Sequence, residues 1–357
     1  MPADRSDVAL ETLFLPFSEG RLPWPTGGAK FLRARDGWPL HEQPLPGLVC
    51  EQSFKPEADA LAQAGLAVNV ADRAKTYELV LILPPRQRDE ARALMARAAA
   101  MTKPGGRIIV AQSNDEGARS SENDLAQLAG DVESMSKHKC RVFWTASLAR
   151  LNVSLVAQWQ ELDAVRSIAD GRFMSRPGIF AWDRIDVASA LLAEHLPTNL
   201  AGRAADLGAG FGYLSAELLT RCPGIVALDA YEAENRALQL ARVNLKSFEA
   251  RTPIDYRWHD VAAGLPDTYD VIVTNPPFHA QRAIDRPDIG RRFIAVAADA
   301  LRPGGKLWLV ANRHLPYEHV LSENFGSVRT VVQQHGYKII EAVRAKTAAR
   351  AAKKAAR

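Results

Sequence analysis

The sequence predicts an α/β protein in which two doubly wound, Rossmann-like domains follow one another. Short, β-rich apolar runs alternate with longer helical patterns through both halves of the chain, which is typical of parallel sheets covered by helices. The punctuation between these runs also repeats. In the first half, the apolar run 77–85 ends in Pro-Pro, a helical pattern follows over 86–101, and a Pro-Gly-Gly turn leads into the apolar run 103–112.

The same order returns in the second half of the chain. The run 269–277 again ends in Pro-Pro, the helical pattern 290–301 follows, and a second Pro-Gly-Gly turn leads into the run 302–312. Matching punctuation at corresponding places favours an internal duplication, although two ordinary strand–helix–strand units would share part of it. Because Leu83 stands in the first copy where Asn275 stands in the second, we expect the N-terminal copy to be degenerate.

The length of 357 residues suits two domains of ordinary size. A mixed, polar segment near 155–175 is followed by the turn-forming Arg176-Pro177-Gly178 and marks the junction. We therefore predict one domain over 1–165, a second over 166–342 and a tail over 343–357. The first 45 or so residues are rich in Pro, Gly and Trp, and we expect loops or short edge strands there.

Composition narrows the class of protein. The three cysteines (Cys50, Cys140 and Cys222) lie far apart and form no Cys-x-x-Cys pair, which argues against a disulfide framework or a zinc site. The N-terminus carries acids where a signal peptide needs a basic flank. No apolar stretch approaches the roughly 20 residues that a membrane span needs. We expect a cytoplasmic protein without membrane contact.

The basic charge of the chain is concentrated at its C-terminus. Six basic residues and no acid follow Val343. Their six positive charges exceed the formal net charge of +4 for the whole chain. The rest of the chain therefore has a net charge of about −2 and is close to neutral. Two interpretations stay open for this tail: a solvated, disordered end, or an arm that follows the phosphates of a nucleic acid.

A glycine-rich segment runs from Asp206 to Gly212 and reads acidic-x-Gly-x-Gly-x-Gly. It lies between an apparent strand end and a helix start, where alternating glycines let the backbone turn sharply and approach a ligand, and the helix offers free N–H groups. A dinucleotide fold would place a third glycine at position 213, where Tyr213 stands. The pattern resembles the form seen in class I methyltransferases, and an unrelated tight turn is the alternative.

Two acids follow at apparent strand ends. Asp229 ends the apolar run GIVALDA, and in doubly wound nucleotide folds an acid at the end of the second strand accepts from the ribose hydroxyls. An N-cap for the helix that follows is the other interpretation. Asp260 follows a later strand-like run. We assign it a contact with an adenine amino group, for which the sequence gives less support than for the role of Asp229.

The most specific element is Asn275-Pro276-Pro277-Phe278 at the end of an apolar run. An amino group conjugated to a ring or a carbonyl is planar and poorly nucleophilic. Two acceptors, the Asn275 side-chain oxygen and the Pro276 carbonyl, can take its two hydrogens and favour a pyramidal nitrogen. The prolines stiffen the backbone, and Phe278 offers a stacking face for a flipped base. The pattern predicts methyl transfer to an exocyclic or amide nitrogen.

At this point the chain resembles a known family. The stretch from about Phe173 to Ala342 is similar to the bacterial ribosomal-RNA guanine-N2 methyltransferases of the RsmC/RlmG type, with most likeness to the small-subunit (16S) enzyme. The first half is similar to the degenerate N-terminal domain of that family. The matching pieces are PGIFAWDRIDVASALL, DLGAGFG, TNPPFH, LRPGGKLWLVANRHLPYE and FGSVRTVVQQHGYKIIEA, with KHKCRV near the end of the first half.

The resemblance implies S-adenosylmethionine as cofactor and ribosomal RNA, within the small subunit, as partner. It implies that the second domain is catalytic and that the first is an RNA-binding scaffold. Catalysis falls to Asn275, Pro276, Pro277 and Phe278. The implied cofactor contacts are Asp206, Gly208, Gly210, Gly212, Asp229 and Asp260, with Phe180 and Asp186 on a lid over the cofactor.

Other functions stay open at this stage. Methyltransferases for 23S ribosomal RNA guanine, DNA adenine-N6 or protein glutamine-N5 share the nitrogen-activating turn, although Phe278 and the duplicated first half argue against the last two. A non-catalytic RNA-binding assembly factor is a candidate from another class. His279, His314 and His319 lie apart in the sequence, so we assign no metal and give His279 only a contact with a substrate phosphate.

Overall fold

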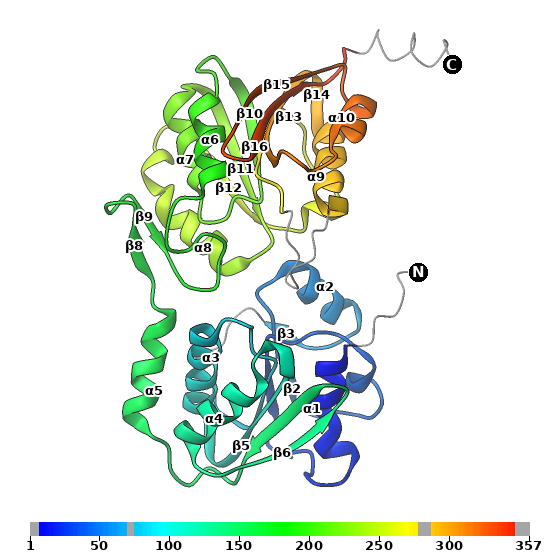
Figure 1. Ribbon diagram of the computed structural model, residues 1–357, viewed down its shortest axis with the longest axis vertical. Helices are drawn as coiled ribbons and strands as arrows, with labels where there is room; N and C mark the ends of the chain where they lie inside the picture. The colour runs from blue at the N-terminus through cyan, green and yellow to red at the C-terminus, as the bar shows by residue number, and fades with distance from the viewer. Residues whose placement is uncertain (1–6, 70–74, 278–286, 347–357) are drawn as a thin grey trace. The chain divides into compact units, whose positions relative to one another are not determined.

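The computed structural model describes residues 7–69, 75–277 and 287–346 and is shown in Figure 1. The chain divides into two compact units. The N-terminal unit runs up to Val165 and includes Arg176–Gly178, and the C-terminal unit holds Arg166–Ser175 and everything from Ile179 onward. No helix in the described part of the chain is long and apolar enough to cross a bilayer.

The N-terminal unit is built on a seven-stranded sheet with the order β3-β2-β1-β4-β5-β7-β6. The first five strands along the chain are parallel, and β6 and β7 form an antiparallel edge. Its strands are β1 (Ala29–Leu32), β2 (Leu48–Glu51), β3 (Val68–Asn69), β4 (Tyr77–Ile82), β5 (Thr102–Ser113), β6 (Val132–Lys137) and β7 (Cys140–Thr145). Its helices are α1 (Val8–Ser18), α2 (Lys55–Gln63), α3 (Arg88–Met101), α4 (Ala118–Ala129) and α5 (Val153–Gln160).

The C-terminal unit repeats this topology. Its seven-stranded sheet has the order β12-β11-β10-β13-β14-β16-β15, and a separate hairpin, β8 (Arg166–Ile168) with β9 (Phe173–Ser175), precedes it. The strands of the sheet are β10 (Ala201–Leu207), β11 (Gly224–Glu232), β12 (Ile254–Trp258), β13 (Tyr269–Thr274), β14 (Leu301–Asn312), β15 (Ser327–Gln334) and β16 (Tyr337–Val343). The helices are α6 (Val187–His195), α7 (Tyr213–Arg221), α8 (Asn235–Asn244), α9 (Pro287–Ala300) and α10 (Glu318–Asn324).

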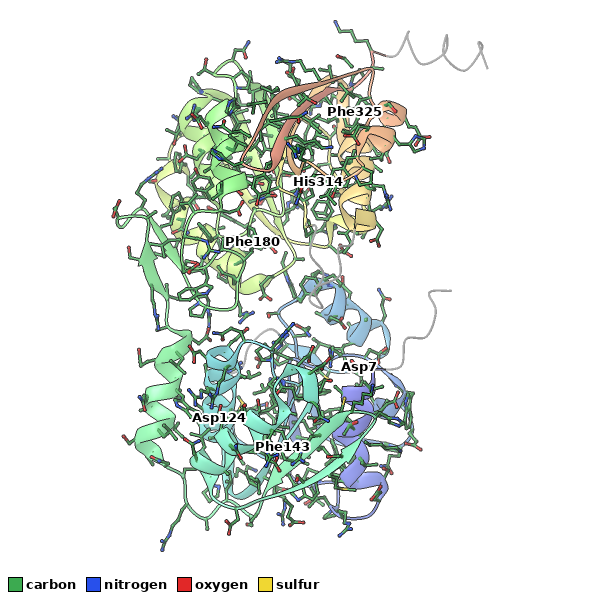
Figure 2. All side chains as sticks on the ribbon, in the orientation of Figure 1. Asp7, Asp124, Phe143, Phe180, His314 and Phe325 are labelled. Carbon is green, nitrogen blue, oxygen red and sulfur yellow. The ribbon has the colours of Figure 1, made fainter. Side chains whose placement is uncertain are left out.

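Each sheet is covered by helices on both faces (Figure 1), which explains the continuous apolar runs of its central strands. In β13, Val271 and Val273 pack into one cluster with α6 and α7, whereas Ile272 packs on the opposite face with α9. The buried Phe143 and Phe325 belong to the cores of the N-terminal and C-terminal units respectively (Figure 2). The tandem doubly wound fold predicted from the sequence is confirmed.

The pairing registers align the two units residue by residue. Leu32 pairs with Glu51 and Ile82 in the N-terminal unit, as Leu207 pairs with Tyr231 and Thr274 in the other. The residues that follow these positions are therefore equivalent. The loop Arg33-Ala34-Arg35 corresponds to Gly208-Ala209-Gly210, Gln52 to Glu232, and Leu83 to Asn275, so the predicted correspondence of Leu83 with Asn275 is confirmed.

The interpretation of the first 45 residues as loops or edge strands is wrong. This stretch contains α1, which packs on the sheet, and β1, which is a central strand. The sequence concealed both elements. Pro16 lies inside α1, and β1 has only four residues, one of which is the fully buried Lys30. Lys30 is tolerated there because its ammonium group bonds Asn69 at 2.7 Å and faces Glu51 at 3.2 Å.

Candidate active site

The glycine loop after β10 needs glycine for two different reasons. Gly208, Gly210 and Gly212 have φ values of 77°, 57° and 92°, in the left-handed region that strains other residues. A Cβ added to Gly210 would meet nothing within 4 Å, and one added to Gly208 would lie 4.0 Å from the Asn275 carbonyl oxygen. A Cβ on Gly212 would lie 3.2–3.3 Å from Leu245 and Ala241. Gly210 thus borders open space and Gly208 has only ordinary contacts, the nearest being Phe293 at 3.8 Å, whereas Gly212 lets the start of α7 pack closely against the end of α8.

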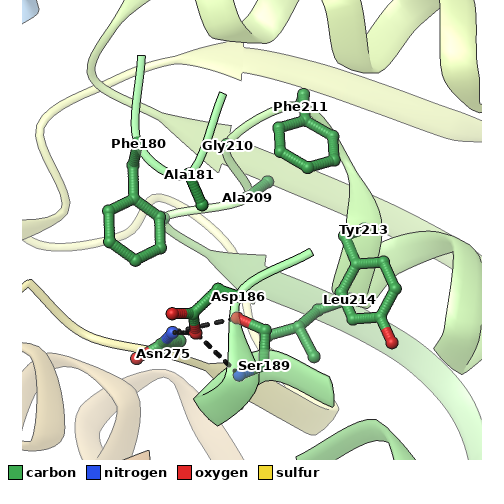
Figure 3. Close-up of a pocket in the computed structure, with 11 residues that line it drawn as sticks. Phe180, Ala181, Asp186, Ser189, Ala209, Gly210, Phe211, Tyr213, Leu214 and Asn275 are labelled. Carbon is green, nitrogen blue, oxygen red and sulfur yellow. Dashed lines mark hydrogen bonds between the residues drawn. The ribbon is translucent and has the colours of Figure 1, made fainter. Parts of the chain in front are cut away.

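A cleft of about 430 Å³, including its open mouth, lies over this loop. Figure 3 shows side chains from three segments converging on it: the stretch before α6, the glycine loop and the residue after β13. Five of the predicted site residues line the cleft, namely Phe180, Asp186, Gly208, Gly210 and Asn275. Phe180 is 64% exposed, so its ring borders the cleft without being packed into the core. Asp206, Gly212, Asp229 and Asp260 are not among the lining residues.

The Asn275 side chain has one end bound and the other end open. Its Nδ2 donates to Asp186 Oδ2 at 3.0 Å and to Ser189 Oγ at 2.9 Å (Figure 3). Its Oδ1 is buried and has no hydrogen-bond partner among the residues that the structure describes. Pro276 is buried and Pro277 is exposed, while Phe278 and His279 lie outside the described residues. A buried amide oxygen without a hydrogen-bond partner costs free energy, so a ligand that donates an N–H or O–H to it is bound favourably.

Asp206 lies near the end of β10, two residues before Gly208. Its carboxyl group is fully buried and accepts from Ser215 Oγ at 2.7 Å. Burial raises the pKa of Asp206 to about 7; the Ser215 hydrogen bond opposes this rise, and the charge of Glu232 adds to it. Its Oδ1 has no partner within the described ranges. This acid therefore carries a charge that the unliganded site does little to compensate.

The titration of Asp206 should make the stability of the unliganded protein pH-dependent. The unfolded chain loses this proton near pH 3.8 and the folded chain near 7, so the free energy of unfolding falls as pH rises through that window and levels off above it. Asp206→Asn keeps an acceptor for Ser215 but cannot ionise. Its melting temperature relative to wild type should therefore be higher at pH 8 than at pH 5, measured by calorimetry without ligands. An equal difference at both pH values would contradict the buried-charge account.

Asp229 does not lie at the end of its strand. β11 continues three residues beyond it, and its carboxylate is 2% exposed. It accepts from Arg203 Nη2 at 2.7 Å and from the Tyr269 hydroxyl at 2.6 Å. Both contacts occupy it inside the protein, away from the cleft lining. These contacts give Asp229 a structural role, and the ribose contact predicted for it stays a prediction.

The acid at the end of β11 is Glu232, which the sequence analysis missed. Glu232 Oε2 accepts from the backbone N–H of Gly210 at 2.8 Å, and its Oε1 accepts from the N–H of Glu234 at 2.8 Å. Burial raises the pKa of Glu232, and these backbone hydrogen bonds oppose the rise. The carboxylate is thus held against the glycine loop. The sequence signal for a longer strand was Tyr231, an aromatic residue two positions after Asp229. In the structure this residue is fully buried.

Asp260 follows β12, as predicted, and caps a short 3₁₀ turn over Val261–Ala263. Its side chain accepts from the N–H of Ala262 at 2.9 Å and is half-buried. One carboxylate oxygen is used by this cap. Among the residues that the structure describes, the second oxygen makes no further hydrogen bond.

Comparison with known proteins gives consistent results. The family model of the methyltransferase small domain (MTS) matches residues 170–341. The ribosomal RNA small subunit methyltransferase C of Psychromonas ingrahamii is 26% identical over 75% of this chain and 76% of its own length. The protein of the same name from Chromohalobacter salexigens is 35% identical over 58% of this chain and 61% of its own.

A solved structure matches both units. The T. thermophilus 16S rRNA N2 G1207 methyltransferase (RsmC), in complex with AdoMet and guanosine, has a TM-score of 0.76 at 26% identity, covering 95% of this chain and 92% of that one. The repeated sheet order, the glycine loop and the Asn-Pro-Pro turn define a class I methyltransferase. Within that class, the relatives that this chain resembles over most of its length are RsmC-type ribosomal RNA methyltransferases, and the resemblance stated from the sequence is confirmed.

Proposed function

We propose that the C-terminal unit transfers a methyl group to the exocyclic N2 amino group of a guanine in 16S ribosomal RNA. The single observation that carries this proposal is the buried Oδ1 of Asn275, an acceptor without a described partner beside the glycine loop. The related T. thermophilus enzyme, whose complex holds AdoMet and guanosine, supports the substrate. The cofactor is S-adenosylmethionine, which supplies a methyl group on a positively charged sulfur.

In this proposal the protein acts on the amino group by accepting its hydrogens. Asn275 Oδ1 and the Pro276 carbonyl each take one N–H of the guanine amino group, which withdraws the nitrogen lone pair from conjugation. The proton leaves after the transfer, so no strong base is required. Phe278, which lies outside the described residues, stacks on the flipped base in this account, and Pro276 and Pro277 keep the turn rigid.

The residues around the cleft fit the cofactor. Gly208 and Gly210 leave backbone space above the loop, and Phe180 and Asp186 border the same cleft. We assign the ribose hydroxyls to Glu232, because its carboxylate is held at the loop by Gly210, and Asp229 becomes a structural acid paired with Arg203. Asp260 keeps its proposed contact with the adenine amino group. Asp206, whose pKa burial raises to about 7, would contribute negative charge in its ionised form to a site that would hold a positively charged cofactor.

The N-terminal unit is proposed as an RNA-binding scaffold that takes no cofactor. Arg33 and Arg35 occupy the places of Gly208 and Gly210, and Arg35 forms an ion pair with Asp7 at 2.9 Å. Leu83, which is 4% exposed, offers no acceptor where Asn275 does. Substitution of both the loop and the acceptor removes the two features on which the catalytic proposal depends.

The basic tail is smaller than the sequence suggested. The Arg344 guanidinium donates to the Asn324 carbonyl at 3.0 Å, so this residue belongs to the folded unit, and Lys346 is exposed. The remaining four basic residues, Arg350, Lys353, Lys354 and Arg357, lie outside the described residues. Their contact with RNA phosphates stays a proposal.

Deleting residues 347–357 should therefore make RNA binding less dependent on salt. With about 0.7 per phosphate contact for single strands, loss of four basic residues makes the salt slope shallower by at most about 3. The product should not change, because phosphate contacts position the RNA while the pocket reads the base. The measurement is ribosomal RNA affinity against salt concentration for both proteins. Equal slopes would make the tail a solvated end.

The proposed function is tested by offering radiolabelled S-adenosylmethionine with small subunits, large subunits, stripped ribosomal RNA and DNA. We expect transfer to small-subunit RNA, in stripped or assembled form. Transfer to DNA, or to large subunits alone, would contradict the assignment of small-subunit RNA as the substrate. Tight RNA binding without transfer to any of them would support the assembly-factor alternative. We expect the reaction to take place in the cytoplasm, where bacterial ribosomal subunits are assembled.

A further inference from the structure

We propose that Asp186 and Ser189 are positioning residues that hold the Asn275 amide in one orientation and strengthen its Oδ1 as an acceptor. This inference rests on the proposed function, because it assigns Asn275 Oδ1 to the reacting amino group. Asp186 and Ser189 lie 89 and 86 residues before Asn275 in the sequence. Both reach it because the start of α6 lies beside the end of β13 (Figure 3).

The two contacts fix which end of the amide faces the cleft. Asn275 Nδ2 has two hydrogens, and Asp186 Oδ2 and Ser189 Oγ are two acceptors at 3.0 and 2.9 Å. Rotating the amide by 180° would place its carbonyl oxygen against the Asp186 carboxylate, where two acceptors repel each other. Only the observed orientation satisfies the carboxylate. Asn275 Oδ1 is therefore held on the side without described partners.

The carboxylate that holds the amide is itself held. Asp186 is the N-cap of α6, and its Oδ2 also accepts from the backbone N–H of Ser189 at 2.8 Å. The N-terminus of a helix favours negative charge. Ala188 and Leu192 in α6 are fully buried and share a cluster with Val273 of β13. The helix, the carboxylate and the amide are thus fixed against the same face of the sheet.

The charge of Asp186 adds to the orientation. A charged acceptor on Nδ2 draws the amide hydrogens and shifts electron density toward Oδ1, since hydrogen bonds in a chain polarise one another. The effect is strongest away from water, and Ser189 is only 8% exposed while Asp186 is half-buried. Asn275 Oδ1 therefore takes a guanine N–H more strongly than an isolated amide would.

The N-terminal unit provides an internal comparison. Its helix α1 packs on the sheet face equivalent to that covered by α6, and its N-cap Asp7 accepts from the N–H of Leu10 at 3.1 Å. Asp7 thus corresponds to Asp186 and Leu10 to Ser189. Where the amide is replaced by Leu83, the serine is replaced as well, and the capping acid alone is kept. This pattern is expected if the Ser189 hydroxyl is needed to bind the Asn275 amide and is not needed to cap the helix.

The proposal is tested with Asp186→Asn and Ser189→Ala in the full-length enzyme. Asn caps helices as well as Asp does, so Asp186→Asn should melt near wild type. We expect kcat to fall by about 10- to 100-fold in each variant, as small misplacements of a reacting group do, with the dissociation constant of Ser189→Ala for S-adenosylmethionine within about twofold of wild type. Asp7→Asn is the matched control, because the same change at the equivalent cap should leave kcat unaltered.

A double-mutant cycle separates positioning from other roles. If Ser189 acts only through Asn275, Ser189→Ala should cost nothing further in an Asn275→Ala background, whereas additive losses would overturn the proposal. Weakened cofactor binding with normal kcat at saturation would also overturn it, and would make Asp186 a cofactor contact instead. If Asn275→Ala is inactive but Asp186→Asn and Ser189→Ala are both fully active, the positioning role is overturned. Full activity of Asn275→Ala would instead remove the role that the proposed function assigns to Asn275 Oδ1.

Discussion

Replacing Asn275 by alanine should lower the rate of methyl transfer by roughly 10²–10³-fold, the loss seen when one preorganised hydrogen-bonding group is deleted from an active site. The reason is that the buried Oδ1, which has no partner within the described part of the chain, is the acceptor we assign to the guanine amino group. The affinity for S-adenosylmethionine should change little. Single-turnover transfer of a radiolabelled methyl group and calorimetric titration of the cofactor measure the two quantities separately.

Asn324→Ala is a matched control for this variant. The Asn324 amide lies in the same unit and donates to the Val320 carbonyl within α10 at 2.8 Å, so its removal deletes an amide of the same size at a site without proposed chemistry. Its rate should equal that of wild type. Activity of Asn275→Ala within a few-fold of wild type would rule out the assigned role of the amide.

The second large effect is expected at Glu232. Glu232→Gln keeps the size of the side chain but loses its charge and one acceptor, and a hydrogen bond to a charged group contributes about 1.5–3 kcal/mol. The dissociation constant for S-adenosylmethionine should therefore rise by about 10- to 100-fold. The glutamine oxygen can accept from Gly210 or from Glu234 but not from both, so the unliganded protein should also lose some stability, and cofactor affinity is compared at a temperature where the variant is fully folded.

Asp229→Asn should show the opposite behaviour. Asp229 is buried and paired with Arg203, so the loss of its charge should lower the free energy of unfolding by about 1–3 kcal/mol and leave cofactor affinity near wild type. Titration calorimetry and denaturant unfolding of both variants distinguish the two acids. Weaker cofactor binding in Asp229→Asn, with normal binding in Glu232→Gln, would return the ribose role to Asp229.

The parts of the fold with continuous apolar runs were predictable from the sequence. β4 and β13 are buried on both faces over Leu79–Ile82 and Val271–Val273, where they read as hydrophobic runs, and the Pro-Pro and Pro-Gly-Gly sequences after them indicated the duplication. The short β1, with its buried Lys30, has no such run, because its charge is compensated by partners that only the folded chain brings together. The helix α1 was missed for the related reason that its apolar residues surround a proline.

The site was predictable where a motif is local and not where it is assembled by tertiary contact. The glycine loop and the Asn-Pro-Pro turn are contiguous, so both were recognised. The contacts of Asn275 with Asp186 and Ser189 join residues more than 80 positions apart, and the sequence carries no signal for Ser189. The end of β11 was placed three residues early because Ala230 and Tyr231, which continue the strand, were taken to follow its end.

The central claim is that the methyl group goes to the amino nitrogen of guanine, and the identity of the methylated nucleoside tests it most directly. Small-subunit ribosomal RNA methylated by the full-length protein with isotopically labelled S-adenosylmethionine is digested to nucleosides and analysed by mass spectrometry. The account predicts that the label appears in N2-methylguanosine and that Asn275→Ala removes it. Label in a ring-methylated guanosine, a methylated adenosine or a 2′-O-methylated nucleoside would contradict the proposed role of the Asn275 acceptor.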